Sequence, residues 1–386
     1  MIRVLNLYGD PRSIGFQHGQ QVADLRPQIC SAIEHRLAEL NQPGFDFSKT
    51  MAGMTSAFEV HAQSTLEMLQ GMAEALDFEW EKYYTYTLAS FLDSQIKNYQ
   101  EGDGCTTWAA TGKYTRDQAP VLAKNRDYKL DHIPLQCLAR VRPTHGFPYI
   151  CLTSAGSPGV FNSGMNSKGL AVADTFVASK DLGFGIPRYS LMMNILEKFE
   201  TVQDAIQYFH TVPHTGDGTV ILVDASGDMA VFEIAHSVQA VRIPEDDFIA
   251  STNHFTFPVM RKLWVDREPP HLKGNTRERY RRVRRAIKAS SGKIDIPWSQ
   301  DLMTQHQGPL GAICRHAELS DISSTIGSII YLPKLACLWV ANGVPCRTQY
   351  ECFSVTDQNS IKTEVDRLAR LPVDLFPGTP LPTSGG

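Results

Sequence analysis

The sequence changes its pattern abruptly at residue 105. Before that point, apolar residues recur at three- and four-residue steps, as in residues 22–40, 66–76 and 80–91. This spacing predicts helices for the first hundred residues. After residue 105, short β-branched runs between Gly, Pro, Asn and Asp predict strands as far as about residue 243. Helices followed by grouped strands indicate a layered α+β domain rather than a βαβ alternation.

The strand-rich part also contains three predicted helices, at residues 188–199, 203–209 and 276–289. Residues 224–228 lie between two apolar runs and predict a hairpin turn. The runs that predict strands are residues 105–110, 121–124, 149–152, 170–173, 219–223, 230–234, 324–332 and 336–341.

Composition excludes several classes of protein. The chain has 386 residues, which corresponds to two or three domains or to one large enzyme domain. Apolar residues make up 42% and charged residues 20%, as in soluble globular proteins. The formal charge of -4 gives no basic surplus, so we expect no nucleic-acid partner. No apolar run has a membrane-spanning length and the N-terminus does not resemble an export signal, so we expect no membrane and a cytoplasmic location.

The eight cysteines do not have the spacing of a metal site. No two of them form a CxxC pair, so we expect neither a zinc nor an iron–sulfur site, and no other cofactor. A chain of this length can bury a core without disulfides, so most of these thiols are expected to be reduced and buried. The cysteines are Cys30, Cys105, Cys137, Cys151, Cys314, Cys337, Cys346 and Cys352.

The sharpest local feature is the Gly104-Cys105 pair, where the helical part gives way to the first predicted strand. The ordinary interpretation is a glycine turn followed by a buried cysteine. The functional interpretation makes Cys105 a nucleophile. Because Gly104 has no Cβ, the thiol of Cys105 can approach the Gly104 carbonyl carbon.

Attack by this thiol on the Gly104 carbonyl would give a thioester, and hydrolysis would leave Cys105 as a new chain N-terminus. A thiol has a pKa of about 8.5 and an α-amine one of about 7.7–8.0, so the amine can accept the thiol proton near neutral pH. The nucleophile and its base then belong to one residue, and no histidine partner is needed.

Six motifs, one of which contains the Gly104-Cys105 pair, follow the same order as the motifs of one enzyme family. They are Gly9-Asp10-Pro11-Arg12-Ser13-Ile14-Gly15-Phe16-Gln17-His18-Gly19, Asp103-Gly104-Cys105-Thr106-Thr107, Lys124-Asn125-Arg126-Asp127-Tyr128, Gly164-Met165-Asn166-Ser167-Lys168-Gly169, Ser251-Thr252-Asn253-His254-Phe255, and the late pair Ile313-Cys314-Arg315 and Thr325-Ile326-Gly327-Ser328-Ile329-Ile330-Tyr331. With these motifs the chain resembles the acyl-coenzyme A:6-aminopenicillanic acid acyltransferase (isopenicillin N acyltransferase) family of cysteine N-terminal-nucleophile (Ntn) hydrolases.

The resemblance implies a four-layer αββα sandwich of the Ntn-hydrolase type with a helical N-terminal segment. It implies a zymogen that cleaves itself into an α chain, residues 1–104, and a β chain, residues 105–386. The two chains would form one compact domain and remain associated as a heterodimer. The implied substrate is a small N-acyl amide.

The resemblance also implies roles for individual residues. Asp127 would orient the Cys105 amine and raise its basicity, and Asn253 would donate its amide to the tetrahedral oxyanion. The simpler alternatives are a turn aspartate and a loop asparagine that bonds to local backbone. Asn125 is a candidate for substrate binding or for bracing the same turn. His254 is interpreted as structural, because a free amine already serves as the base.

One departure from the family concerns the segment before the late strand. The fungal acyltransferase has an arginine in this turn, whereas residues 320–325 contain none. Asp321 stands where the fungal enzyme has a serine, so we expect it to bind a substrate with a cationic or neutral amine. This departure favours hydrolysis, with acyl transfer from acyl-coenzyme A to an amine as the alternative.

A run of arginines on the helix predicted at residues 276–289 has two interpretations. One is an anion site for the coenzyme A phosphates, and the more ordinary one is a solvated basic helix face. The run consists of Arg277, Arg279, Arg281, Arg282, Arg284 and Arg285.

Three functional hypotheses remain open from the sequence. The first is the self-processing amidohydrolase or acyltransferase. The second is a papain-like pair of Cys105 and His254, which would be active without cleavage at Gly104. The third is an unprocessed and inert family member that acts as a binding scaffold.

Overall fold

Two β-sheets form the centre of the protein in a computed structural model that describes residues 1–40, 47–96, 104–157, 159–244, 246–306, 308, 310–317 and 323–356. Within these residues, sheet A has eight strands in the order β1-β4-β5-β6-β7-β8-β9-β10, and sheet B has six in the order β11-β2-β3-β12-β13-β14. The strands of sheet A are β1 (Arg3–Gly9), β4 (Gln136–Pro143), β5 (Tyr149–Ser154), β6 (Ser163–Asn166), β7 (Ala171–Thr175), β8 (Gly218–Val223), β9 (Met229–Ile234) and β10 (Gln239–Arg242). Those of sheet B are β2 (Gly104–Ala110), β3 (Val121–Tyr128), β11 (Phe248–Ser251), β12 (Ser324–Leu332), β13 (Cys337–Asn342) and β14 (Glu351–Ser354).

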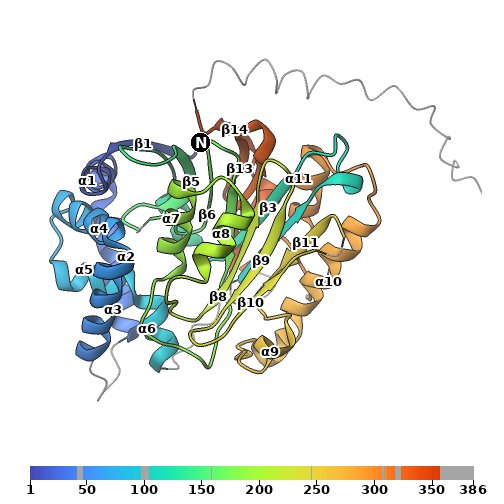
Figure 1. Cartoon of the computed structure of the whole chain (residues 1–386). Coiled ribbons are helices and arrows are strands. Elements are labelled where there is room, and N and C mark those ends of the chain that lie inside the picture. Colours follow the sequence, from blue (N-terminus) through green and yellow to red (C-terminus); the bar gives the residue numbers. More distant parts are fainter. Residues whose placement is uncertain are drawn as a thin grey trace, which may run out of the picture.

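Helices cover the outer faces of the two sheets (Figure 1). The helices on the side of sheet A are α1 (Pro11–Gln21), α2 (Arg26–Leu40), α3 (Ser48–His61), α4 (Gln63–Ala75), α5 (Trp80–Thr87), α6 (Ala89–Ile96), α7 (Arg188–Lys198) and α8 (Val202–Phe209). The later helices are α9 (Pro258–Arg261), α10 (Asn275–Lys288) and α11 (Ile296–Thr304), and α10 and α11 pack on sheet B.

Three apolar clusters hold these elements together. The inner cluster joins one face of sheet A, for example Leu138 and Ile221, to one face of sheet B, for example Leu122 and Ile329. A second cluster lies between the other face of sheet A and the N-terminal helices, and a third lies between sheet B and the helices α10 and α11. Because strand side chains alternate between faces, each sheet supplies apolar residues to two clusters.

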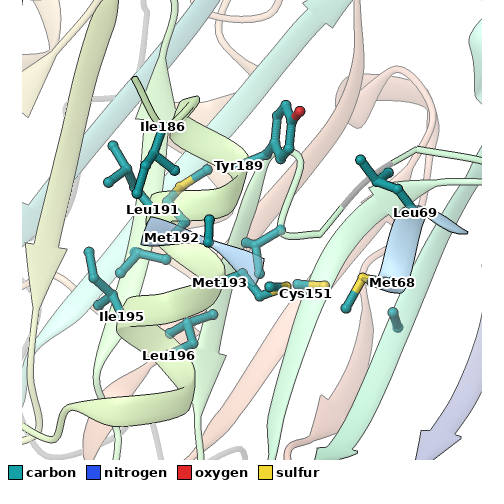
Figure 2. Packing of buried hydrophobic residues seen from close by; sticks show 14 of the residues in the cluster. Met68, Leu69, Cys151, Ile186, Tyr189, Leu191, Met192, Met193, Ile195 and Leu196 are labelled. Carbon is teal, nitrogen blue, oxygen red and sulfur yellow. The ribbon is translucent and has the colours of Figure 1, made fainter. Parts of the chain in front are cut away.

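Helix α7 shows how tightly the helical side is packed. All of its residues from Tyr189 to Glu197 are buried, which is typical of a helix enclosed on every side. Figure 2 shows its side chains Met193 and Leu196 near Met68 of α4 and Cys151 of β5. The first turn of α7 thereby has a fixed position next to the cavity described below.

The glycines of the first motif allow helices α1 and α4 to touch. A Cβ on Gly15 would lie 1.9 Å from the carbonyl oxygen of Met68, and one on Gly71 would lie 2.1 Å from that of Arg12. Only glycine allows this approach, so these positions are explained by packing.

The prediction of a mixed α+β fold with an N-terminal helical region is confirmed. The predicted hairpin is also present, since β8 and β9 pair in antiparallel register. The division into residues 1–104 and 105–386 stays a prediction. Within the described residues, no helix is both long and apolar enough to cross a bilayer.

One detail of the helical prediction is wrong. Residues Arg3–Gly9 form β1, which pairs in parallel with β4. The reason is visible in the sequence, because Leu5 and Leu7 are buried whereas Asn6 and Tyr8 are exposed, which is the two-residue period of a strand. The N-terminal segment therefore contributes a strand to sheet A as well as helices.

His18, from the first motif, is buried and neutral in the folded protein. The N–H of Gly156 donates to its Nε2 atom at 3.2 Å, and burial lowers the pKa of His18 to about 4. Its contribution to stability is fully present above the unfolded pKa of about 6.5 and is lost as the pH falls toward 4, since only the unfolded chain then binds the proton.

We expect His18→Gln, which keeps an acceptor for Gly156, to reduce the loss of stability between pH 6.5 and pH 5 by about 2 kcal/mol. Urea unfolding at both pH values measures this difference. His145→Gln changes an exposed histidine and is expected to leave the pH dependence as in the wild type. An unchanged pH dependence in His18→Gln would contradict the assignment.

Candidate active site

Cys105 is half-buried at the start of β2 and lies on the wall of a cavity of about 560 Å³. The cavity is enclosed by helix α2, the α5–α6 connection, strand β3 and the first turn of α7. Its walls combine aromatic rings, including Phe161 and Phe176, with charged side chains, including Arg126 and Arg188. This size and mixture are typical of a site for a small molecule.

Hydrogen bonds hold the backbone of Cys105 on both sides. Its N–H donates to Oδ1 of Asn253 at 3.0 Å, and its carbonyl oxygen accepts from Nη1 of Arg279 at 2.6 Å. Nη2 of Arg279 also donates to Oδ1 of Asn253 at 2.8 Å. Because a guanidinium group only donates, the Asn253 oxygen must face Cys105 and Arg279. Nδ2 of Asn253 then donates to the carbonyl oxygen of Phe176 at 2.9 Å.

Arg279 is a site residue that the sequence analysis missed. It belongs to the arginine run on α10, yet it is buried, whereas Arg281 and Arg285 of the same run are exposed. The ordinary interpretation as a solvated face therefore fails at this one position. Burial lowers the pKa of Arg279 to about 10, so it still carries its charge at neutral pH.

A signal for Arg279 does exist in the sequence. Asn275, Arg279, Val283 and Ile287 recur every four residues and form the buried face of α10. An arginine on such a stripe must find partners inside the protein. Here the partners are Oδ1 of Asn275, at 2.8 Å from Nε, and the groups around Cys105.

Asp127 lies opposite Gly104 in the antiparallel pair of β2 and β3. Its Oδ1 accepts from the hydroxyl of Thr325 at 2.6 Å. Its Oδ2 is buried and has no hydrogen-bond partner in the part of the chain that the structure describes, although Nη1 of Arg315 is 3.6 Å away. A Cβ on Gly104 would lie 2.4 Å from that Nη1 and 2.7 Å from Oδ2, so a side chain there would collide with both groups.

Because residues 320–325 contain no arginine, the sequence led us to expect Asp321 rather than an arginine at the site. The position of Arg315 corrects this expectation. An arginine does reach the site, but it comes from an earlier position in the segment that leads to β12. Its backbone is anchored by Thr325, whose Oγ1 accepts from the Arg315 N–H at 2.8 Å. Asp321, the residue predicted to bind substrate in that turn, lies outside the described residues.

Asn125 does not face the cavity, which corrects its prediction as a substrate-binding residue. Its Nδ2 donates to the carbonyl oxygens of Met303 and Ile313, both at 2.9 Å, and its side chain is fully buried. Successive residues of a strand point to opposite faces, so Arg126 next to it lines the cavity instead. Asn125 therefore connects the end of α11 to the segment that carries Arg315.

His254 has the environment of a structural residue. Burial and then the charge of Arg279 lower its pKa to about 3, and its Nδ1 is 3.1 Å from the hydroxyl oxygens of both Thr252 and Thr276. A neutral imidazole bonded in this way is poorly suited to deprotonate Cys105. The geometry therefore disfavours the papain-like pair.

A network of buried charges includes three residues of the cavity wall, Asp174, Arg188 and Asp217. Nζ of Lys124 and Nε of Arg188 both bond to the carboxylate of Asp174, and Nη1 of Arg188 bonds to Asp217 at 2.9 Å. Two cations thus face two carboxylates, which limits the cost of burying each charge. Burial nevertheless raises the pKa of Asp217, even though Arg188 acts in the opposite direction.

The sequence model of the acyl-coenzyme A:6-aminopenicillanic acid acyl-transferase family matches residues 114–346, which is more than half of the chain. In a comparison with curated proteins, none matches.

Solved structures with a similar arrangement include two enzymes. One is a mutant of the conjugated bile acid hydrolase from Clostridium perfringens, with 16% identity and a TM-score of 0.43, covering 66% of this chain and 93% of that one. The other is the penicillin V acylase from Agrobacterium tumefaciens, with 17% identity and a TM-score of 0.42, covering 62% of this chain and 83% of that one.

We expect Asn125→Ala to destabilise the fold, because two buried carbonyl groups lose their donor and each such loss costs about 1–3 kcal/mol. Asn6→Ala changes an exposed asparagine and is expected to alter stability by about 0.5 kcal/mol at most. Urea unfolding of both variants gives the comparison. Equal stability of the two variants would show that Asn125 does not brace this segment.

Proposed function

The chain belongs to the acyl-coenzyme A:6-aminopenicillanic acid acyl-transferase family, and on this premise we propose that it is a self-processing cysteine amidohydrolase. Cys105 is the N-terminal nucleophile of the proposal, and the substrate is a small N-acyl amide. The observation that carries the proposal is the meeting of Gly104, Cys105 and Asp127 at the wall of one cavity.

In the first reaction, Sγ of Cys105 attacks the carbonyl carbon of Gly104. The carbon–nitrogen bond breaks, a thioester forms, and the Cys105 nitrogen becomes a free amine. Water then hydrolyses the thioester, which leaves a carboxylate on Gly104 and restores the thiol. The small size of Gly104 supports this step, since a Cβ at this position would collide with Asp127 and Arg315.

The new amine would form beside two oxygen acceptors. Oδ1 of Asn253 already accepts from the Cys105 nitrogen, and among the described residues the buried Oδ2 of Asp127 has no hydrogen-bond partner. A protonated amine would satisfy this carboxylate oxygen, and the carboxylate would raise the pKa of the amine. Asp127 is thus proposed to orient the base.

In the second reaction, Cys105 transfers its thiol proton to its own amine and attacks the substrate carbonyl. Of the two hydrogens on Nδ2 of Asn253, one bonds to Phe176, and the proposal assigns the second to the oxyanion. The amine product leaves with the proton from the Cys105 ammonium group, and water releases the acid from the thioester.

Hydrolysis is proposed rather than transfer from acyl-coenzyme A, because arginines of the basic run on α10 interact with other side chains and do not form a binding site for phosphate groups. Arg281 and Arg285 both pair with Glu278, and Arg284 lies over the rings of Phe248 and Tyr280. No residue of α10 in the described part of the chain lines the cavity.

The proposal also assigns the fold to the αββα type, with residues 1–104 and 105–386 as its two mature chains. The layers of helix, sheet A, sheet B and helix support this assignment. Cys105 then starts a strand with a neighbour on either side, as expected for a nucleophile held rigidly by a sheet.

We expect Cys105→Ala to remain one folded chain without activity, because no nucleophile is left for either reaction. Cys105→Ser should be cleaved more slowly or not at all, since an alcohol is a poorer nucleophile than a thiolate. Intact-mass measurement detects the two wild-type fragments, and release of free amine from N-acyl amino acids and penicillin V measures activity. Cys30→Ala, which replaces another free cysteine, is the matched control.

The same measurements separate the other hypotheses. Cleavage of Cys105→Ala at the same bond would overturn the maturation mechanism. An uncleaved wild-type chain that hydrolyses amides would favour a papain-like site, and an uncleaved and inert chain would favour the scaffold.

We expect Asp127→Asn to shift the acidic limb of the kcat/KM profile to lower pH, because the amine loses the carboxylate that raises its pKa. Asp301→Asn, an exposed change on α11, should leave the profile unchanged. The profile is measured on processed enzyme with the best substrate of the panel. If Asp127→Asn lowers the rate but leaves the acidic limb of the profile at the same pH, Asp127 supports the fold and does not affect the pKa of the amine.

A further inference from the structure

Two histidines and two cysteines meet at the end of α11, on the side of sheet B. They are His306, Cys314, His316 and Cys346, called here the Cys2His2 cluster. One potential ligand atom of each lies within 4.8 Å of all the others. The two reactions proposed for Cys105 do not use any of these four side chains.

The spacing of the cluster fits a tetrahedral metal site. Nε2 of His316 is 3.6 Å from Sγ of Cys314 and 3.4 Å from Sγ of Cys346. Zinc binds sulfur at about 2.3 Å and nitrogen at about 2.0–2.1 Å, so the ligand atoms of a tetrahedral site are separated by about 3.3–3.8 Å. A small inward movement of the remaining pairs would complete this geometry.

The imidazole of His306 already has the tautomer that a metal requires. Its Nδ1 lies 2.9 Å from the carbonyl oxygen of Thr304, and a carbonyl oxygen only accepts, so Nδ1 carries the hydrogen. Nε2 therefore carries the lone pair. A backbone carbonyl that fixes a ligand histidine in this way is a common feature of zinc sites.

The protein backbone brings the three segments of the cluster together without help from a metal. The carbonyl oxygen of Gln305, next to His306, accepts from the N–H groups of Ile313 and Cys314 at 2.9 and 2.8 Å. Cys346 belongs to the short helix η6 (Pro345–Arg347), which follows β13. The ligands are thus largely in place, which lowers the entropic cost of binding.

We propose that the Cys2His2 cluster binds one structural Zn²⁺ ion. Two thiols would lose their protons on binding, and the two thiolates would neutralise the charge of the ion in a site where two of the four ligands are buried. Thiolate and imidazole ligands in tetrahedral geometry select zinc over magnesium or calcium.

The ion would hold Arg315 at the active site. Cys314 and His316 flank Arg315 in the sequence, and their ligand atoms converge on the cluster while Nη1 of Arg315 points to Asp127. Zinc would connect this segment to the end of α11 and to η6. The expectation of no zinc site was based on the missing CxxC pair, but a site assembled from three separate segments needs no such pair.

The test is the zinc content of untagged full-length protein, purified under reducing conditions, supplied with zinc and dialysed. We expect about one zinc per chain in the wild type by mass spectrometry of the metal. His306→Ala removes an exposed ligand and Cys346→Ser a half-buried one, and both should bind zinc at least about tenfold more weakly. His145→Ala and Cys30→Ser are the matched controls and should retain wild-type zinc.

A second measurement does not depend on retained metal. Cobalt(II) added to the metal-free wild type should give the absorption of a tetrahedral thiolate site, which Cys346→Ser should weaken. Chelator treatment should increase alkylation of Cys314 and Cys346 but not of Cys30. Wild type without bound zinc, unchanged zinc in His306→Ala, or a Cys314–Cys346 disulfide in protein purified without a reductant would each overturn the proposal.

Discussion

The register between β2 and β3 is the constraint on which the candidate site depends. It places Gly104 opposite Asp127, so backbone hydrogen bonds rather than a flexible loop fix the carboxylate beside the Gly104-Cys105 bond. The neighbouring strands complete the arrangement. Asn253 follows the end of β11, and Thr325 lies near the start of β12, so both lie at the same end of the strands of sheet B. Two consecutive strands, β2 and β3, and two much later strands, β11 and β12, thereby build one small polar site.

Local patterns predicted most of this framework. The apolar runs at residues 121–124 and 219–223 became β3 and β8, and the helix at 188–199 became α7 with nearly the same bounds. These elements are long or strongly periodic, so their type is fixed by their own residues. The strand β1 was missed because its alternation is short and adjoins a helix.

Residues that work through tertiary contacts could not be found in this way. Arg279 looks like its solvated neighbours until its place on the buried face of α10 is known. Arg315 and the Cys2His2 cluster depend on how the segment before β12 folds against α11, which no spacing in the sequence encodes. Asn125 shows the opposite error. Its motif predicted a substrate-binding residue, whereas its side chain bonds to the backbone of the segment that carries Arg315.

The pairing of β1 with β4 has a consequence for the life of the processed enzyme. Leu5 and Leu7, together with the helices that follow, share one apolar cluster with sheet A, so a break after Gly104 would sever the chain without freeing a fragment. Residues of both segments belong to this one buried cluster, as in the core of a single domain. Maturation would then be invisible to any method that measures the size of the native particle, and only denaturation would separate the two pieces.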